Sequence, residues 1–278
     1  MVPIQSILVG LDLTPDCAAV WREACALARS LEAELHLVHA VTDLDPRSPE
    51  LEHALSGAES RLLELRQAAI DQGARVAPAV FARAGDAGET IAQAARDLRV
   101  DLVVIGTGVR SASDRRALGF TAERVLRDVE ARVWIVRPAR PHERVERIVA
   151  AVDAARPQRE VIHAAGLIAR PGRLGLTVLA LYPEGARGAD VLERVRAAVG
   201  GTAAESLDVE VYARATTAPP TDLVDVAERD CVDLLVLGEA PHPTPRRREE
   251  VVERLLRVAP CSILRVPLAP VAAPAGVA

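Results

Sequence analysis

Lysine and asparagine are absent from the 278 residues, so all 34 basic side chains are arginines, and Met1 is the single methionine. Without lysine the protein can form no Schiff base, has no lysine general base and cannot place a Walker-type lysine on a β- or γ-phosphate. These absences exclude several classes of enzyme.

Patterns typical of metal sites and nucleophiles are missing as well. The four cysteines form no C-x-x-C pair, and each lies in or beside an apolar stretch, so we expect four small core residues. His36 and His39 are three apart in an expected strand, which puts them on opposite faces and argues against a shared metal ion. There is no G-x-S-x-G elbow. We therefore predict no metal site and no catalytic residue.

The charge pattern disfavours two kinds of partner. A net charge of −5, with acidic and basic residues interspersed, offers no basic surface to nucleic acid or to an anionic membrane. The first residues, MVPIQSILVGLD, lack the regions of a signal peptide, and no uncharged apolar run is long enough for a membrane span. We expect a cytoplasmic protein, and a hydrophobic content of 50% suffices for two buried cores.

Apolar runs alternate with amphipathic stretches of helical period, and the series occurs twice. In the first half, strands are expected at 6–11, 34–41, 75–82, 102–105 and 133–136, and helices at 18–31, 51–72, 89–98 and 119–128. Four segments of the second half repeat segments of the first: 147–153 repeats 6–12, 229–238 repeats 97–106, 253–257 repeats 123–127, and 262–267 repeats 133–138. A short helix is expected at 190–199. One ancestral unit written twice is the simplest interpretation.

Strands that alternate with helices and read as continuous Val, Ile and Leu runs predict parallel sheets covered on both faces. The expected fold class is α/β, with two tandem doubly wound parallel five-stranded sheets in 3-2-1-4-5 order, flanked by helices. We predict domains at 1–139 and 145–269, followed by a flexible tail at 270–278. In such sheets ligands bind at the carboxyl ends of the strands, near the point where the strand order reverses.

The stretch 101–121, DLVVIGTGVRSASDRRALGFT, is the strongest candidate for such a site. Its apolar strand stops at Gly106, and after an arginine-rich loop Gly119 precedes a helix. A helix N-terminus presents free backbone N–H groups and the positive end of the helix dipole, which together attract an anion. Asp12 ends the first strand, and the 3-2-1-4-5 order would place it beside this loop.

These residues identify a family. A first strand that ends in Asp, five strands interleaved with four helices, a glycine loop after the fourth strand, and ERVLR before a strand reading VWIVRP resemble the universal stress protein family. The resemblance covers about 4–267 as a tandem pair. It implies a regulatory stress-response protein without enzymatic activity. It also implies ATP as a ligand, held by a G-x2-G-x9-G-(S/T) loop.

The resemblance places individual residues. Gly106 and Gly119 keep the family's glycine separation, but the middle glycine falls on Val109 and the Ser/Thr on Phe120. Gly108 and Thr121 each lie one position away, so a one-residue shift of the loop would absorb either substitution alone. The two together predict weakened ATP binding.

Two further positions match outside the loop. Asp12 corresponds to the family's adenosine-contacting aspartate, and Ala40 to the position whose backbone meets the adenine. In the second half, Asp153 survives, but the stretch that follows Gly238, EAPHPTPRRREE, contains no further glycine. That half is therefore expected to act as a structural partner.

Other interpretations remain open for the same residues. Asp12 could simply turn the chain and cap the next helix. Arg110, Arg115 and Arg116 could neutralise a phosphate or form a solvated loop face. A dinucleotide fingerprint, with Ser111 in the third glycine's place, is disfavoured because no amphipathic helix follows directly.

The function also has alternatives. A nucleotide-processing enzyme would be expected to show an SGGxD or HxGH signature after the first strand, where this chain has LDLTPDC. A binder of a non-nucleotide small molecule or of a partner would use an apolar crevice lined by Phe120. Exposed edge strands predict a paired arrangement of the two halves and a homo-oligomer.

Overall fold

The structure, a computed structural model, describes residues 3–108, 118–137, 145–239 and 254–268. Contacts divide the chain into two compact units, one of Val2–Val145 with Cys261–Leu264 and the other of Glu146–Pro260 with Arg265–Ala278. This division passes through the last strand. The predicted domain limits of 1–139 and 145–269 therefore stay a prediction, and the predicted tail at 270–278 lies outside the described residues.

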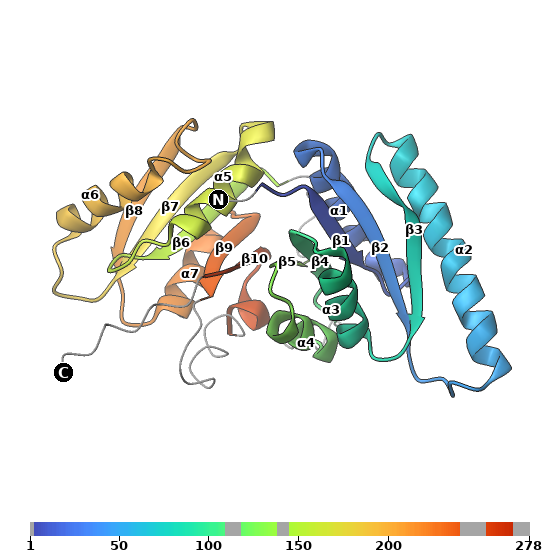
Figure 1. The fold of residues 1–278 in the computed structure, drawn as a ribbon. Coiled ribbons are helices and arrows are strands. Elements are labelled where there is room, and N and C mark those ends of the chain that lie inside the picture. Colours follow the sequence, from blue (N-terminus) through green and yellow to red (C-terminus); the bar gives the residue numbers. More distant parts are fainter. Residues whose placement is uncertain (1–2, 109–117, 138–144, 240–253, 269–278) are drawn as a thin grey trace, which may run out of the picture. The chain divides into compact units, whose positions relative to one another are not determined.

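The first unit is a parallel sheet with four helices (Figure 1). Its strands are β1 (Ser6–Gly10), β2 (Glu34–Val41), β3 (Arg75–Ala84), β4 (Leu102–Gly106) and β5 (Arg132–Val136). A 3-10 turn, η1 (Pro15–Cys17), precedes α1 (Ala18–Leu31), and the other helices are α2 (Pro49–Asp71), α3 (Ala87–Leu98) and α4 (Phe120–Asp128). The strand order is β3-β2-β1-β4-β5, and the neighbouring pairs run parallel. This confirms the predicted α/β class and strand order.

The second unit repeats this order as β8-β7-β6-β9-β10. Its strands are β6 (Arg147–Asp153), β7 (Gly175–Tyr182), β8 (Val209–Ala215), β9 (Leu234–Glu239) and β10 (Ser262–Pro267). Its helices are α5 (Arg159–Gly172), α6 (Gly188–Val199) and α7 (Pro219–Arg229), and residues 254–258 are also helical. The sequence had predicted limits for only part of this half.

The same side-chain tie fixes the first strand in both units. The Asp101 carboxylate accepts hydrogen bonds from Gln5 N and Ser6 N at 2.9 and 3.0 Å. Asp233 accepts at 3.0 Å from the equivalent amides, Glu146 N and Arg147 N. Each aspartate stands just before the strand that neighbours the first one, so each tie holds two sequence-distant strands side by side.

Capping residues explain where two helices begin. Ser48 accepts from Leu51 N at 3.2 Å with Pro49 after it, and Asp86 accepts from Glu89 N at 2.9 Å. Both helices therefore start two residues earlier than predicted. The third strand, β3, also runs two residues past its predicted end.

The cores are built from the apolar strand residues, and the largest fully buried side chain is Trp134 in β5. Cys25 and Cys261 are buried, whereas Cys231 is exposed, so the prediction of a core cysteine is wrong there. Cys231 adopts a left-handed backbone conformation, with φ of 53°, in the turn that follows α7. No helix within the described ranges is long and apolar enough to cross a membrane.

Two helical glycines give a test of this packing. An alanine Cβ at Gly166 in α5 would lie 2.4 Å from Ala204 N, whereas Gly57 in α2 has nothing within 4 Å. Gly166→Ala should lower the free energy of unfolding by about 3 kcal/mol through overpacking. Gly57→Ala should raise it by about 0.5–1 kcal/mol. Urea denaturation measures both, and equal effects of the two substitutions would contradict the packing described.

Candidate functional site

The carboxyl ends of β1 and β4 meet at the reversal of strand order in the first unit. These strands are neighbours, in register from Ile7–Leu102 to Val9–Val104. Asp12 follows β1 by two residues, and Gly106 ends β4. The structure therefore brings Asp12 to the same sheet edge as the start of the glycine loop. Of that loop, 109–117 lie outside the described residues, including Val109, Ser111 and the three arginines proposed for phosphate.

Gly119 sits against the end of β4 at backbone distance. Its N–H donates to the Thr107 carbonyl at 2.8 Å, and a Cβ at Gly119 would lie 2.8 Å from that oxygen and 3.1 Å from Gly108 Cα. Only glycine allows this approach. Gly108 itself has φ of +72°, a conformation that residues with a side chain rarely adopt. The left-handed residue is thus Gly108, one position before Val109.

The helix that follows begins without a side-chain cap. Gly119 is the N-cap of α4 and has no side chain with which to bond the first-turn amides. These N–H groups, from Phe120 and Thr121 onward, therefore depend on water or a ligand for hydrogen bonds. Thr121 is half-buried, and the Phe120 side chain is 68% exposed. Such exposure gives no support to Phe120 as the lining of an enclosed apolar crevice.

Gly106 has a packing role. A Cβ there would lie 3.1 Å from Val20 Cγ2 on α1, and at the equivalent Gly238 a Cβ would lie 2.8 Å from Val161 Cγ2 on α5. In both units the glycine makes room for a valine of the first helix. The residue is therefore explained by packing in each half, without a ligand.

Asp12 uses one carboxylate oxygen for the local turn. Its Oδ1 accepts hydrogen bonds from Thr14 N at 3.0 Å and from Thr14 Oγ1 at 2.8 Å, so Asp12 stabilises the turn of the chain after β1. Asp12 is exposed, and no bond to its second oxygen is seen among the described residues. A ligand hydroxyl could therefore bond to Oδ2 without disturbing the turn.

Two residues of β2 complete the edge. Ala40 lies beyond Gly10–Val38, the last register pair of β1 and β2, and pairs with Arg83 of β3. Its backbone on the β1 side therefore lies at the open end of the sheet. His39 Nδ1 lies 2.7 Å from the Leu11 carbonyl oxygen, and this bond holds the chain just ahead of Asp12.

A model of the universal stress protein family matches residues 3–137 of this chain. This segment belongs to the universal stress protein family. Among curated proteins, none matches the sequence.

Solved structures extend the likeness of fold along nearly the whole chain. A universal stress protein from Archaeoglobus fulgidus is 18% identical, with a TM-score of 0.74 over 94% of this chain and 98% of its own. A functionally unknown protein from Pseudomonas aeruginosa is 19% identical, with a TM-score of 0.71 over 95% of this chain and 92% of its own. The universal stress fold is thus present in both halves.

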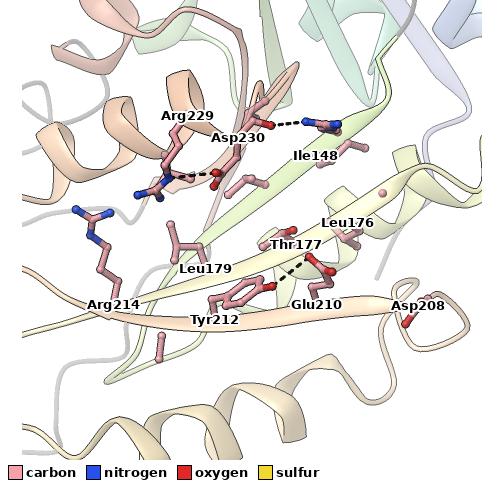
Figure 2. Close-up of a pocket in the computed structure, with 16 residues that line it drawn as sticks. Ile148, Leu176, Thr177, Leu179, Asp208, Glu210, Tyr212, Arg214, Arg229 and Asp230 are labelled. Carbon is pink, nitrogen blue, oxygen red and sulfur yellow. Dashed lines mark hydrogen bonds and ion pairs between the residues drawn. The ribbon is translucent and has the colours of Figure 1, made fainter.

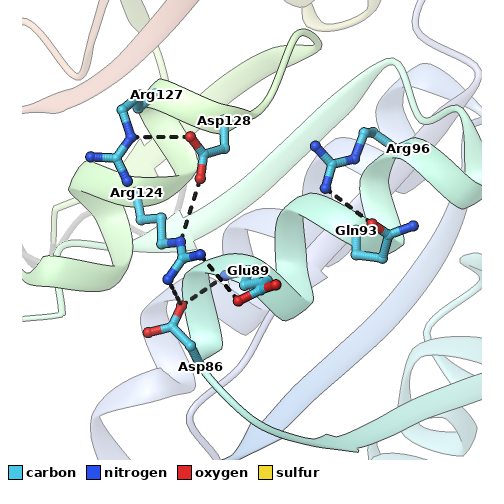
Figure 3. Close-up of polar contacts among 7 residues, drawn as sticks. All are labelled: Asp86, Glu89, Gln93, Arg96, Arg124, Arg127 and Asp128. Carbon is cyan, nitrogen blue, oxygen red and sulfur yellow. Dashed lines mark hydrogen bonds and ion pairs between the residues drawn. The ribbon is translucent and has the colours of Figure 1, made fainter.

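Sequence reasoning missed the residue that joins α3 to α4 in the universal stress segment. Arg124, the arginine of ERVLR, reaches three carboxylates (Figure 3): Asp86 Oδ1 at 3.2 Å, Glu89 Oε2 at 3.1 Å and Asp128 Oδ2 at 3.4 Å. A Cβ at Gly88 would lie 2.7 Å from Arg124 Cβ, so the helices touch here. This contact fixes the position of α4 and hence of its N-terminus. The repeated ERVLR motif was the available signal.

Arg124 also sets a pH dependence. Hydrogen bonds from Arg127 and then from Arg124 lower the pKa of Asp128. A carboxyl whose pKa is lowered in the folded state stabilises the fold above its unfolded pKa of about 3.9, and this contribution is lost as pH falls through the folded pKa.

Arg124→Met should therefore lower the free energy of unfolding by about 1 kcal/mol at pH 7, because three carboxylates are left without their shared cation. The difference from the unsubstituted protein should shrink as pH falls through the lowered pKa of Asp128. Thermal unfolding from pH 7 to pH 3 measures it. A difference that stays constant across this range would show that the loss comes from packing alone.

His36 is a second group that makes the stability of the first unit depend on pH. It is 9% exposed, and its Nε2 lies 3.4 Å from Glu34 Oε2. Burial lowers the pKa of His36, against the smaller opposing effect of Glu34. The unfolded chain therefore binds the proton more tightly, and stability falls as pH drops below about 6.5.

His36→Thr should flatten the dependence of stability on pH between about 7 and 5, since the titrating group is gone. Urea denaturation at several pH values measures the slope. The same slope in both proteins would rule out His36 as its source.

Proposed function

We propose that the chain is a non-enzymatic, cytoplasmic stress-response regulator of the tandem universal stress type, and that its first half binds an adenine nucleotide weakly. The observation that carries this proposal is the backbone contact between Gly108 and Gly119. Two residues without side chains therefore lie against each other directly before an uncapped helix N-terminus. Such an arrangement is suited to phosphate oxygens.

The roles of the residues follow from their positions. The amides of Phe120 and Thr121, with the Thr121 hydroxyl, would hold phosphate oxygens beside Gly106 and Gly108. Asp12 Oδ2 would accept a ribose hydroxyl, and the Ala40 backbone would meet the adenine. The positive φ at Gly108 supports the one-residue shift that Val109 and Phe120 require. Weak binding is expected because the loop departs from the family pattern at both positions.

The second half would serve as a structural partner. Its Asp153 repeats the Asp12 turn, with Oδ1 accepting from Ala155 N at 2.8 Å, but the residues after Gly238 lack the second and third glycines. Nucleotide bound in the first half would stabilise one arrangement of the two halves, and the chain would further associate as a homo-oligomer. Regulation would then act through partners that distinguish these arrangements.

Calorimetry with ATP, ADP and AMP tests the nucleotide site. Asp12→Asn keeps the Oδ1 acceptor for Thr14 but removes the carboxylate, so ATP affinity should fall by about tenfold through the loss of one charge-assisted hydrogen bond. The matched control is Asp153→Asn, which alters the same turn in the other half and should leave ATP binding unchanged.

Three results would count against the proposal in different ways. If no nucleotide binds, there is no site. If AMP binds as tightly as ATP, the loop contributes nothing to the phosphates. If product appears over time with ATP, the protein is an enzyme.

A further inference from the structure

A cavity of about 810 Å³ lies in the second unit, on one face of β6, β7 and β8 (Figure 2). Its lining includes Arg147, Val149, Thr177, Leu179, Tyr212 and Arg229. Arg147 and Gly175 are the first residues of β6 and β7. The cavity therefore lies toward the amino ends of the strands, away from the edge where the proposed nucleotide site lies in the other half.

Strand register shows what fills the equivalent space in the first unit. Thr177 pairs with Val149 of β6, and His36 pairs with Leu8 at the same position of β1. By the same register Gly175 corresponds to Glu34. Where the first unit has the buried imidazole of His36, the second has the hydroxyl of Thr177. Where the first has the Glu34 carboxylate, the second has Gly175, which has no side chain. The second half therefore has smaller side chains at both of these positions.

The helix above the sheet differs in charge. Asp233 and Asp101 make the same ties to the first strand of their units. Arg229 stands four residues before Asp233, and Asp97 stands four residues before Asp101, so Arg229 corresponds to Asp97. Asp97 pairs with Arg83 at 3.6 Å. The second half therefore carries a cation where the first carries an anion.

The neighbouring arginine differs as well. In the first unit Arg83 lies over the Phe81 ring at 5.4 Å. The equivalent residues by register are Arg214 and Tyr212, but Arg214 pairs with Asp222 instead, and Tyr212 is 54% exposed. The aromatic face that is covered in the first half is therefore open in the second.

The cavity has two charged borders of opposite sign. Asp208, just before β8, and Glu210, on β8, are exposed, and within the described part of the chain neither has an ion pair. Glu210 accepts a hydrogen bond only from the Tyr212 hydroxyl, at 3.5 Å. On the other side, Arg229 Nε donates to Asp230 Oδ1 at 3.2 Å in an ion pair (Figure 2), and its terminal nitrogens make no hydrogen bond with another described residue. Arg147 Nη1 donates to the Asp230 carbonyl at 2.9 Å.

An apolar floor with one polar group joins the two borders. Val149 and Leu179 are each 5% exposed, and the Thr177 hydroxyl between the borders makes no hydrogen bond with another described residue. Because β7 lies between β6 and β8, Arg147 on β6 and Glu210 on β8 project from strands about 10 Å apart, two strand spacings, and Arg229 comes from the end of α7. A volume of this size is within the range of small-molecule sites.

We propose that this cavity binds a short peptide with free termini, about three residues long. Its ammonium group would lie at Asp208 and Glu210, and its carboxylate at Arg229 and Arg147. Apolar side chains would pack on Val149, Leu179 and the Tyr212 ring, and a backbone amide would meet the Thr177 hydroxyl. An extended tripeptide spans about 10 Å, whereas a free amino acid is too short to reach both borders. The site is independent of the nucleotide site proposed for the first half.

Calorimetry on the full chain tests the proposal with leucine, dileucine and trileucine, and with trileucine blocked at either end as the N-acetyl or the amide form. Affinity should increase from leucine to trileucine. Each blocked form should bind at least about tenfold more weakly, because each loses one charge-assisted contact. Equal binding of blocked and free trileucine, or no binding of any peptide, would overturn the proposal.

Three variants locate the site. Arg229→Gln and Glu210→Gln each remove one border charge and should weaken trileucine about tenfold. Thr177→His restores the first half's side chain and should abolish binding by filling the floor. Arg196→Gln, an exposed arginine of α6 outside the cavity, is the charge-matched control. If the three variants bind trileucine as the control does, the peptide binds elsewhere and the assignment fails.

Discussion

The carboxylate of Asp101 holds the first and fourth strands of the first unit together, and the rest of that unit depends on this tie. It accepts hydrogen bonds from two successive amides and from the Ser6 hydroxyl, all within 3.0 Å. These residues are more than ninety positions apart in sequence, so the tie fixes a long-range pairing that helix and strand propensities alone do not specify. The reversal of strand order, and with it the edge that carries Asp12 and the glycine loop, follows from this pairing.

Duplication of the unit has left two halves with the same frame and different surfaces. Asp233 repeats the tie, and Gly238 repeats the room for a helix valine that Gly106 provides. The residues that differ include a buried histidine and an aspartate on a helix. In the first half His36 Nε2 lies 3.4 Å from Glu34 Oε2, and Arg83 pairs with Asp97. In the second half Thr177 and Gly175 replace the first two, and the arginines at the other two positions, Arg214 and Arg229, pair with Asp222 and Asp230. A shared backbone therefore supports separate chemistry in each half.

Much of the fold could be predicted from sequence. The apolar runs gave the strands, and the matching segments revealed two copies, because buried parallel strands have a strong and simple pattern. Helix starts were two residues late where Ser48 and Asp86 act as caps, since a cap lies outside the periodic stretch that reveals a helix. The exposure of Cys231 was not predicted, because this cysteine lies in a left-handed turn that no glycine marks in the sequence.

The sites were less predictable for physical reasons. The importance of Gly119 was visible as a motif, but its contact with the Thr107 carbonyl depends on how the loop folds back. The cavity on β6, β7 and β8 arises from the loss of side chains relative to the other copy. A sequence read for motifs records the residues that are present, whereas this volume depends on what Gly175 and Thr177 do not fill. Only alignment of the two halves by strand register reveals it.

The Glu34–His36 pair gives one half of the chain an acid sensitivity that the other half lacks at this strand position. Burial lowers the pKa of His36, so protonation of this imidazole favours unfolding of the first half. Thr177 stands at the corresponding position of the second half and has no such titrating group. Two copies of one frame thus respond unequally to acid at this point.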